Sequence, residues 1–418
     1  MLNIGGIKKH GRGIRTKFSD DLLWLVYLTT EYINMTGDYS ILDENIPYIN
    51  GNLLGENIDE NYDVHLVTEI EENVYEHCKR AIKKSINMGM HGLPKIGSGD
   101  WNDGFSTVGN KGIGESVWLG FFLYEVLNRF IPICEKRSDL EFVNELKNIK
   151  QNLKKALNTS AWDGRWYRRA YTDDGKWIGS NENQEARIDS IAQSWAVISD
   201  AGDNDKKYIC MDSLDNYLVD RENEIIKLLT PAFEKSDLEP GYIKAYLPGV
   251  RENGGQYTHG ALWAVWAETI LGFGEKAMEY YRYINPIEHA RTMETAKKYK
   301  VEPYVISADM YGGNNLAGRG GWTWYTGSSS WFNKIGIENI LGLKIENEIL
   351  RIQPCIPKDW KEYSIKYKYK TNVYNIKIKN PSGRNTGVNK FIFNGKEIEK
   401  KQIKLENNEK LNYIEIEM

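Results

Sequence analysis

Hydrophobic residues recur every three to four positions through most of the first 340 residues, which is the period of an amphipathic α-helix. One such segment opens at Ser19, which is placed to cap it, and stops at Gly37. A second runs from Val74 and ends at Gly89. Further helices are predicted over 114–130, 139–157, 187–199, 205–219, 258–272, 275–283 and 328–341. About nine helices result, separated by long loops rich in glycine and aromatic residues.

The periodicity changes near residue 345. The segments EILRIQP, YSIKYKYK, VYNIKIKN, KFIFNG and NYIEIEM alternate apolar and polar residues, and Asn, Gly and Pro turns separate them. We therefore predict a mainly helical domain over 1–343 and a small antiparallel β-sandwich over 344–418. Paired helices joined by long loops favour an α/α toroid, whose loops would gather at one end and form a cleft.

Composition narrows the possible partners. A chain of 418 residues with 27% charged residues and a net charge of −4 fits a soluble, mildly acidic protein. Lys and Arg are spread along the chain without the basic clusters that nucleic acid requires, so no nucleic-acid partner is expected. Thirteen Trp and 26 Tyr are many for this length, and many of them lie in Gly-rich polar stretches. Such rings either stack on sugars or fill a core, and composition does not decide between the two.

Neither cysteine nor histidine spacing indicates a metal site. The four cysteines are far apart, which is typical of reduced, buried thiols, and the six histidines form no metal-ligand pattern. We expect no metal and no organic cofactor. The N-terminal segment MLNIGGIKKHGRG lacks an apolar signal core, and no window approaches 18 continuous apolar residues. A cytoplasmic protein without a membrane role is expected.

Candidate chemistry is concentrated in three glycine-rich segments. The first, residues 92–104, brings glycines, two aspartates and a tryptophan into one loop between helices. A turn-capping role suits Asp100, whereas Asp103 is the stronger candidate for chemistry. The others cover 248–260 and 318–330, and the last runs into a predicted helix start, where bare N–H groups can bind an anion. Capping of that helix by Ser328 is the alternative.

Four of these motifs carry a family resemblance. GIRTKFSDDLLWL, GSGDWNDG, PGVRENGGQYTHGALWAVWA and GRGGWTWYTGS resemble, in order, the signature segments of glycoside hydrolase family 94. This family includes cellobiose, chitobiose and β-1,2-oligoglucan phosphorylases and the C-terminal part of cyclic β-1,2-glucan synthases. The last two are most similar, through segments such as RIDSIAQSWAVIS and GYIKAYLPG. The resemblance covers essentially the whole chain and implies an (α/α)6 barrel followed by a small β-sandwich.

The resemblance also implies roles for individual residues. Asp103 matches the family's general acid, and Trp101 lies beside it in the donor-sugar pocket. Arg15 and Asp21 match residues that hold donor-sugar hydroxyls. Glu252 is expected to line the cleft, although an internal ion pair with Arg251 is an open alternative. The residues that match the phosphate site are His259, Thr326 and Gly327.

The reaction implied is reversible phosphorolysis of a β-linked glucoside, with a β-1,2-glucan as the best substrate match, giving α-glucose 1-phosphate with inversion. An inverting hydrolase needs two carboxylates ~6.5–9.5 Å apart, whereas a phosphorylase needs only the acid, because phosphate is itself an anionic nucleophile. Phosphate is therefore a co-substrate. The alternatives are an inverting hydrolase and an inactive or partner-dependent chain that serves as a glycan-binding or structural subunit.

The chain departs from the family pattern at its start. Family members carry a large N-terminal β-sandwich, a linker and the first barrel helices before the motif that begins here at Gly13. About nine predicted helices are fewer than the twelve of a complete six-hairpin toroid. We therefore expect a toroid that is incomplete at its N-terminus, and activity that depends on a partner polypeptide or a homodimer.

Overall fold

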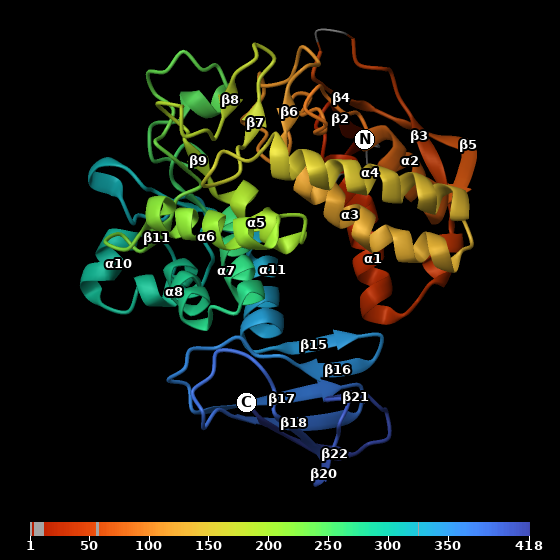
Figure 1. Ribbon diagram of the computed structural model, residues 1–418, viewed down its shortest axis with the longest axis vertical. Helices are drawn as coiled ribbons and strands as arrows, with labels where there is room; N and C mark the ends of the chain where they lie inside the picture. The colour runs from red at the N-terminus through yellow and green to blue at the C-terminus, as the bar shows by residue number, and fades with distance from the viewer. Residues whose placement is uncertain (1, 4–11, 56–57, 325) are drawn as a thin grey trace.

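The computed structural model describes residues 2–3, 12–55, 58–324 and 326–418. Its helices form the larger part of the molecule, and the C-terminal strands form a separate β part next to them (Figure 1). The first strand of that β part begins at Leu343, next to the predicted boundary. A mainly helical region followed by a β region is thus present, as the periodicity predicts.

The long helices alternate between two layers. Five of them pack side by side in chain order, each against the next: α1 (Asp21–Thr36), α3 (Val117–Lys136), α5 (Ser190–Ile198), α7 (Thr258–Leu271) and α11 (Thr326–Lys334). The first four are each covered by the helix that follows: α2 (Val74–Ser85), α4 (Leu140–Thr159), α6 (Asn204–Leu218) and α8 (Gly274–Ile284). This is an arc of α/α hairpins; closure into an (α/α)6 toroid remains a prediction.

Side-chain caps fix where several helices begin. Asn73, Ser116, Asp139 and Asp189 each accept a hydrogen bond from a backbone N–H in the first turn of the helix that follows. The expected cap by Ser19 is wrong, because α1 begins at Asp21 and its Ncap residue makes no side-chain bond. Gly37 does end α1, in the left-handed conformation that glycine adopts without strain.

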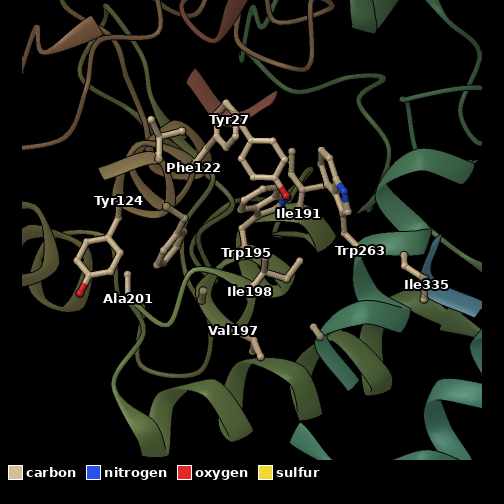
Figure 2. Packing of buried hydrophobic residues seen from close by; sticks show 14 of the residues in the cluster. Tyr27, Phe122, Tyr124, Ile191, Trp195, Val197, Ile198, Ala201, Trp263 and Ile335 are labelled. Carbon is tan, nitrogen blue, oxygen red and sulfur yellow. The ribbon is translucent and has the colours of Figure 1, made fainter. Parts of the chain in front are cut away.

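The core between the helices is aromatic. Trp118, Trp195 and Trp263 are fully buried and pack edge-on or stacked on one another, with Phe122 against two of them. Figure 2 shows Trp195 between Phe122 and Ile191 in this cluster, with Trp263 nearby. Many of the tryptophans are therefore core residues. In the described part of the chain, one helix, α3, has the length and apolar composition of a membrane span, but 78% of that window is buried inside the structure.

The N-terminal part contains strands that periodicity does not predict. A ladder joins β1 (Leu2–Asn3), β2 (Arg12–Thr16) and β4 (Glu60–Val64), and β3 (Asn45–Asn50) pairs with β5 (Leu66–Asn73). Two short helices also lie in a stretch expected to be loop, α9 (Pro286–His289) and α10 (Met293–Tyr299). Many strand side chains here are exposed, so the segments lack the apolar alternation that marks a half-buried strand.

Short elements line the loops between the helices. The two-residue strands are β6 (Glu115–Ser116), β7 (Ala170–Tyr171), β8 (Trp177–Ile178), β9 (Ile188–Asp189), β10 (Val219–Asp220), β11 (Ile225–Ile226), β12 (Leu229–Thr230), β13 (Gln256–Tyr257) and β14 (Asp309–Met310). Single turns are η1 (Ser40–Asp43), η2 (Tyr242–Ala245) and η3 (Asn314–Leu316), and α11 continues as the π-helical η4 (Ile335–Ile340). Several of these strand ends lead directly into the helices whose first residues form the candidate site.

The C-terminal region contains two sheets. One joins β15 (Leu343–Glu346), β16 (Ile349–Ile352) and β21 (Gln402–Lys404); the other has the order β17 (Glu362–Tyr369), β18 (Asn372–Lys379), β22 (Leu411–Glu417), β19 (Lys390–Phe393) and β20 (Lys396–Glu397). The prediction of a wholly antiparallel arrangement is wrong at one pair, because β18 and β22 run parallel with Val373 opposite Leu411. The long connection that carries β19 to β21 allows this crossover.

Candidate active site

A buried ion pair anchors the loop that carries the DWND motif. Asp100 accepts two hydrogen bonds from the Arg169 guanidinium, at 2.6 and 2.7 Å, and one from the Ser116 hydroxyl at 2.6 Å. It also accepts the backbone N–H of Asn102 at 3.0 Å. All four groups are buried. Asp100 therefore has the structural role that the turn-capping alternative assigns to it.

Two further carboxyls face the same arginine. Asp189 lies 3.5 Å from the Arg169 Nε atom, and Asp20 accepts a hydrogen bond from the indole of Trp24 at 2.9 Å. Burial raises the pKa of Asp20 to about 7 and that of Asp189 to about 6. One buried cation thus stands among three acidic side chains, which come from the start of α1, the DWND loop and the start of α5. The cluster ties these segments together.

Asp103, the predicted general acid, is exposed on the DWND loop. Burial and the neighbouring Asp103 raise the pKa of Tyr242, which lies on a turn hydrogen-bonded to Gly104 and Ser106. Glu252 is only 4% exposed, and burial, together with the charge of Asp103, raises its pKa. The Nε atom of Arg251 donates to Glu252 at 3.3 Å. Glu252 is therefore ion-paired and also close enough to Asp103 to feel its charge.

Trp101 and His259, predicted in separate motifs, are in direct contact. The Trp101 indole donates to His259 Nδ1 at 3.3 Å. Burial lowers the pKa of His259 to about 3, so its ring is neutral near neutral pH. Because an indole N–H only donates, Nδ1 is the acceptor and Nε2 carries the proton. This Nε2 atom is buried and has no hydrogen-bond partner among the described residues.

Two hydroxyls, one next to His259 and one next to Gly327 in the sequence, are also buried without a hydrogen-bond partner among the described residues. These are Thr258 Oγ1 and Ser328 Oγ. Ser328 lies inside α11 rather than at its cap, so the capping alternative for it is wrong. Helix α11 begins at Thr326, whose side chain lies outside the described residues, and open space surrounds the position of a Cβ on Gly327.

The predicted donor-sugar residues lie where β2 meets α1. Arg15 is half-buried on β2, and Asp21, the first residue of α1, accepts a hydrogen bond from the Thr16 hydroxyl at 2.9 Å. This junction contacts the DWND loop, because the Ser19 hydroxyl and N–H both donate to the Gly99 carbonyl, at 3.1 and 3.0 Å. The first motif is therefore held against the second.

The sequence interpretation missed one aromatic stack near the site. The Arg251 guanidinium lies over the ring of Tyr246 at 5.2 Å and over that of Trp322 at 4.9 Å. Trp322 and Trp324, in the third glycine-rich segment, are 56% and 68% exposed and so are not core residues. Tyr242 and Tyr246 both come from GYIKAYLPG, a segment noted only for its resemblance. No local signal distinguishes their side chains from other loop tyrosines.

Lysines are also less evenly spread than the sequence suggests. Five of them line a groove of about 640 Å³ along α4 and α6: Lys147, Lys150, Lys154, Lys155 and Lys206. Lys147 pairs with Glu135 and Lys206 with Asp203, which neutralises part of the cluster. None of the predicted site residues lines this groove.

Comparison with known proteins assigns the family. Residues 5–342 match the catalytic domain of the glycosyl hydrolase 94 superfamily. The chain belongs to glycoside hydrolase family 94. It is 45% identical over 371 residues to the cyclic β-(1,2)-glucan synthase NdvB of Rhizobium meliloti, covering 88% of this chain and 13% of the synthase. It is 31% identical to the solabiose phosphorylase of Paenibacillus borealis, covering 91% of this chain and 47% of that enzyme.

A 1,2-β-oligoglucan phosphorylase of Listeria innocua is 24% identical over 372 residues, which cover 81% of this chain and 32% of that protein. The family 94 chain thus spans less than half the length of these relatives. Its fold is similar to that of a family GH78 rhamnosidase from Bacillus sp. GL1, with a TM-score of 0.52 at 10% identity over 88% of this chain and 34% of the rhamnosidase.

Proposed function

We propose that this family 94 chain is an inverting glycoside phosphorylase that cleaves a β-linked glucoside with inorganic phosphate and releases α-glucose 1-phosphate. The supporting observation is the neutral His259 ring beside Trp101, whose buried Nε2–H has no hydrogen-bond partner among the residues that the structure describes. A neutral donor suits an anionic nucleophile that brings its own negative charge. Several relatives of similar sequence are phosphorylases of β-glycosides by name, which supports the same reaction class.

In this proposal, each motif has a separate task. Arg15, Asp21 and Trp101 hold the donor glucose. Phosphate takes hydrogen bonds from the His259 Nε2–H and from Thr326 and the Gly327 N–H at the start of α11, where the helix dipole favours an anion. A phosphate oxygen attacks the anomeric carbon from the face opposite the glycosidic bond. That bond breaks as Asp103 transfers its proton to the leaving oxygen, and the configuration inverts.

The substrate is proposed to be a β-1,2-glucan or another β-gluco-oligosaccharide, because the relatives include a β-(1,2)-glucan synthase and a 1,2-β-oligoglucan phosphorylase. The test is release of phosphate from α-glucose 1-phosphate with glucose, cellobiose or sophorose as acceptor, with Asp103→Asn as control. Acceptor-dependent release that Asp103→Asn abolishes would support the proposal and identify the linkage. A folded protein that releases no phosphate with any acceptor would contradict it.

One observation favours a second candidate, an inverting hydrolase. Glu252 is a second carboxyl near Asp103, and an inverting hydrolase needs a second carboxylate to activate water. Its ion pair with Arg251 and its burial favour a structural or sugar-binding role instead. The two reactions separate when oligosaccharide is incubated without phosphate: a hydrolase still releases free glucose, and Glu252→Gln abolishes that release, whereas a phosphorylase is inactive until phosphate is added.

We also propose that another polypeptide covers α1. Leu28, Tyr32 and Met35 lie on one face of this helix and are 61%, 43% and 44% exposed. The relatives are longer than the segment that matches this chain. We propose that a partner polypeptide equivalent to their additional region packs on this face of α1. Light scattering of the purified chain separates the outcomes: a monomer that gains activity with such a partner supports this proposal, and a stable homodimer would replace it.

A further inference from the structure

We propose that Tyr242 is a positioning residue for the general acid: its phenol donates a hydrogen bond to one oxygen of Asp103 and so aims the other oxygen at the leaving group. This inference rests on the proposed phosphorylase reaction. Asp103 is exposed on a loop, so its carboxyl would otherwise rotate freely between several orientations. A fixed hydrogen bond from a neighbouring segment removes that freedom before substrate binds.

The segment that carries Tyr242 is attached directly to the residues after Asp103. The backbone N–H of Tyr242 donates to Ser106 Oγ at 3.3 Å, and that of Ile243 donates to the Gly104 carbonyl at 3.1 Å. Ile243 is fully buried, so this turn is held by packing as well as by hydrogen bonds. The Tyr242 ring and the Asp103 loop therefore form one unit rather than two loops that meet by chance.

The close approach depends on Gly241. Its φ is +114°, and a Cβ built there would lie 2.4 Å from Ser106 Oγ and 2.8 Å from the Gly104 carbonyl oxygen. A side chain at this position would have to push the two segments apart, and it would also strain the backbone. Glycine in this position permits the short distance between the turn and the loop.

Tyr242 is suited to donate and to keep its own proton. Burial and the neighbouring Asp103 raise its pKa well above the usual range, so the phenol stays protonated throughout the neutral range. The other titratable groups that feel the charge of Asp103 are Tyr246, Glu252 and Tyr257. In phosphorolysis, the O–H bond of Asp103 breaks, its proton bonds to the glycosidic oxygen, and Tyr242 donates to the carboxylate that remains. The reverse reaction returns the proton to Asp103.

The test compares Tyr242→Phe with Tyr208→Phe, which alters an exposed tyrosine on α6. Two β-glucosides are phosphorolysed: an oligosaccharide, whose leaving oxygen needs a proton, and 2,4-dinitrophenyl β-glucoside, whose leaving group needs almost none. For Tyr242→Phe, kcat with the oligosaccharide should fall about tenfold or more, while that with the aryl glucoside changes less than about twofold.

An equal loss of kcat with both glucosides would show a merely structural role and overturn the proposal, as would no loss with either. Ser106→Ala removes the hydrogen bond between the Tyr242 backbone and Ser106 Oγ without altering the phenol. It should produce a smaller loss of kcat, again mainly with the oligosaccharide. If the unmodified protein phosphorolyses neither glucoside, the proposed reaction itself fails. If the unmodified protein is active but Tyr242→Phe behaves like Tyr208→Phe, only the positioning role is contradicted.

Discussion

Glu268 offers a quantitative test of the core around α7. Its side chain is fully buried, and neither carboxyl oxygen has a hydrogen-bond partner among the described residues. Burial raises its pKa from 4.5 to about 8. The carboxyl is therefore protonated in the folded protein near neutral pH and ionised in the unfolded chain. Glu268→Gln replaces it with a neutral group of the same shape, which stays neutral in both states.

The magnitude follows from that difference in pKa. Below pH 4.5 both states hold the proton, and the favourable contribution of the folded-state proton is fully present. Between pH 4.5 and 8 only the folded state retains it, so the free energy of unfolding falls by about 1.4 kcal/mol per pH unit. The loss reaches about 5 kcal/mol by pH 8, which is 3.5 units above 4.5. At pH 7.5, Glu268→Gln should therefore be more stable than the unmodified protein by about 4 kcal/mol.

Thermal unfolding at a series of pH values from 4.5 to 8.5 measures the effect. The unmodified protein should lose stability as pH rises, and Glu268→Gln should have a higher unfolding temperature whose advantage grows over this range. The control is Glu145→Gln, an exposed glutamate on α4 that should leave the pH dependence unchanged. Parallel pH curves for Glu268→Gln and the unmodified protein would refute the assigned burial of a protonated carboxyl.

Three further changes test separate parts of the molecule. His259→Asn should raise the KM for phosphate about tenfold or more, with a much smaller effect on the KM for the glucoside, because the proposed mechanism has the buried Nε2–H donate to phosphate. Initial rates at varied phosphate measure this. Gly241→Ala should lower kcat, because its Cβ separates the Tyr242 turn from Ser106, and should also destabilise the fold by about 1–3 kcal/mol through its positive φ. Gly37→Ala, with φ +71° and a Cβ 2.1 Å from Asn347 Oδ1, should destabilise the fold by about 1–2 kcal/mol in chemical denaturation.

Periodicity predicts the long helices because each buries one face against a neighbour. α2 and α4 show it clearly, with buried residues at three- and four-residue intervals. Periodicity does not predict the strand pair β3–β5, because both strands are exposed on much of both faces. Such strands need no alternation of apolar and polar residues. The sequence pattern also cannot predict that β18 and β22 pair in parallel, because apolar and polar residues alternate in the same way in parallel and antiparallel strands.

For the site, the motifs identify which segments matter but not which side chains meet. The contact between Trp101 and His259 joins residues 158 positions apart, and the ion pair of Arg169 with Asp100 spans 69. Arg169 itself belongs to none of the glycine-rich segments, so nothing in its neighbourhood marks it. The sequence does not mark Tyr242 for the same reason, because its proposed role depends on a turn that the fold places against Gly104.

In two motifs, SDD at 19–21 and DWND at 100–103, one aspartate has a structural role and the other is available to substrate. In each, the first carboxyl is buried and structural, Asp20 at 5% exposure and Asp100 at 2%, while the second, Asp21 or Asp103, keeps exposed surface for a substrate. Asp100→Asn removes the charge that pairs with the buried Arg169 guanidinium. The cost should be about 3 kcal/mol, because the buried guanidinium loses its two short carboxylate bonds and keeps only the longer 3.5 Å contact with Asp189.

Asp103→Asn touches none of that network, so its unfolding temperature should match that of the unmodified protein while phosphorolysis is lost. Measuring both quantities for both variants separates folding from catalysis. If Asp100→Asn proved as stable as the unmodified protein, the buried cluster would not be what holds the DWND loop. If Asp103→Asn lost stability together with activity, its inactivity would say nothing about proton transfer, and the assignment of the general acid would have to rest on the leaving-group experiment alone.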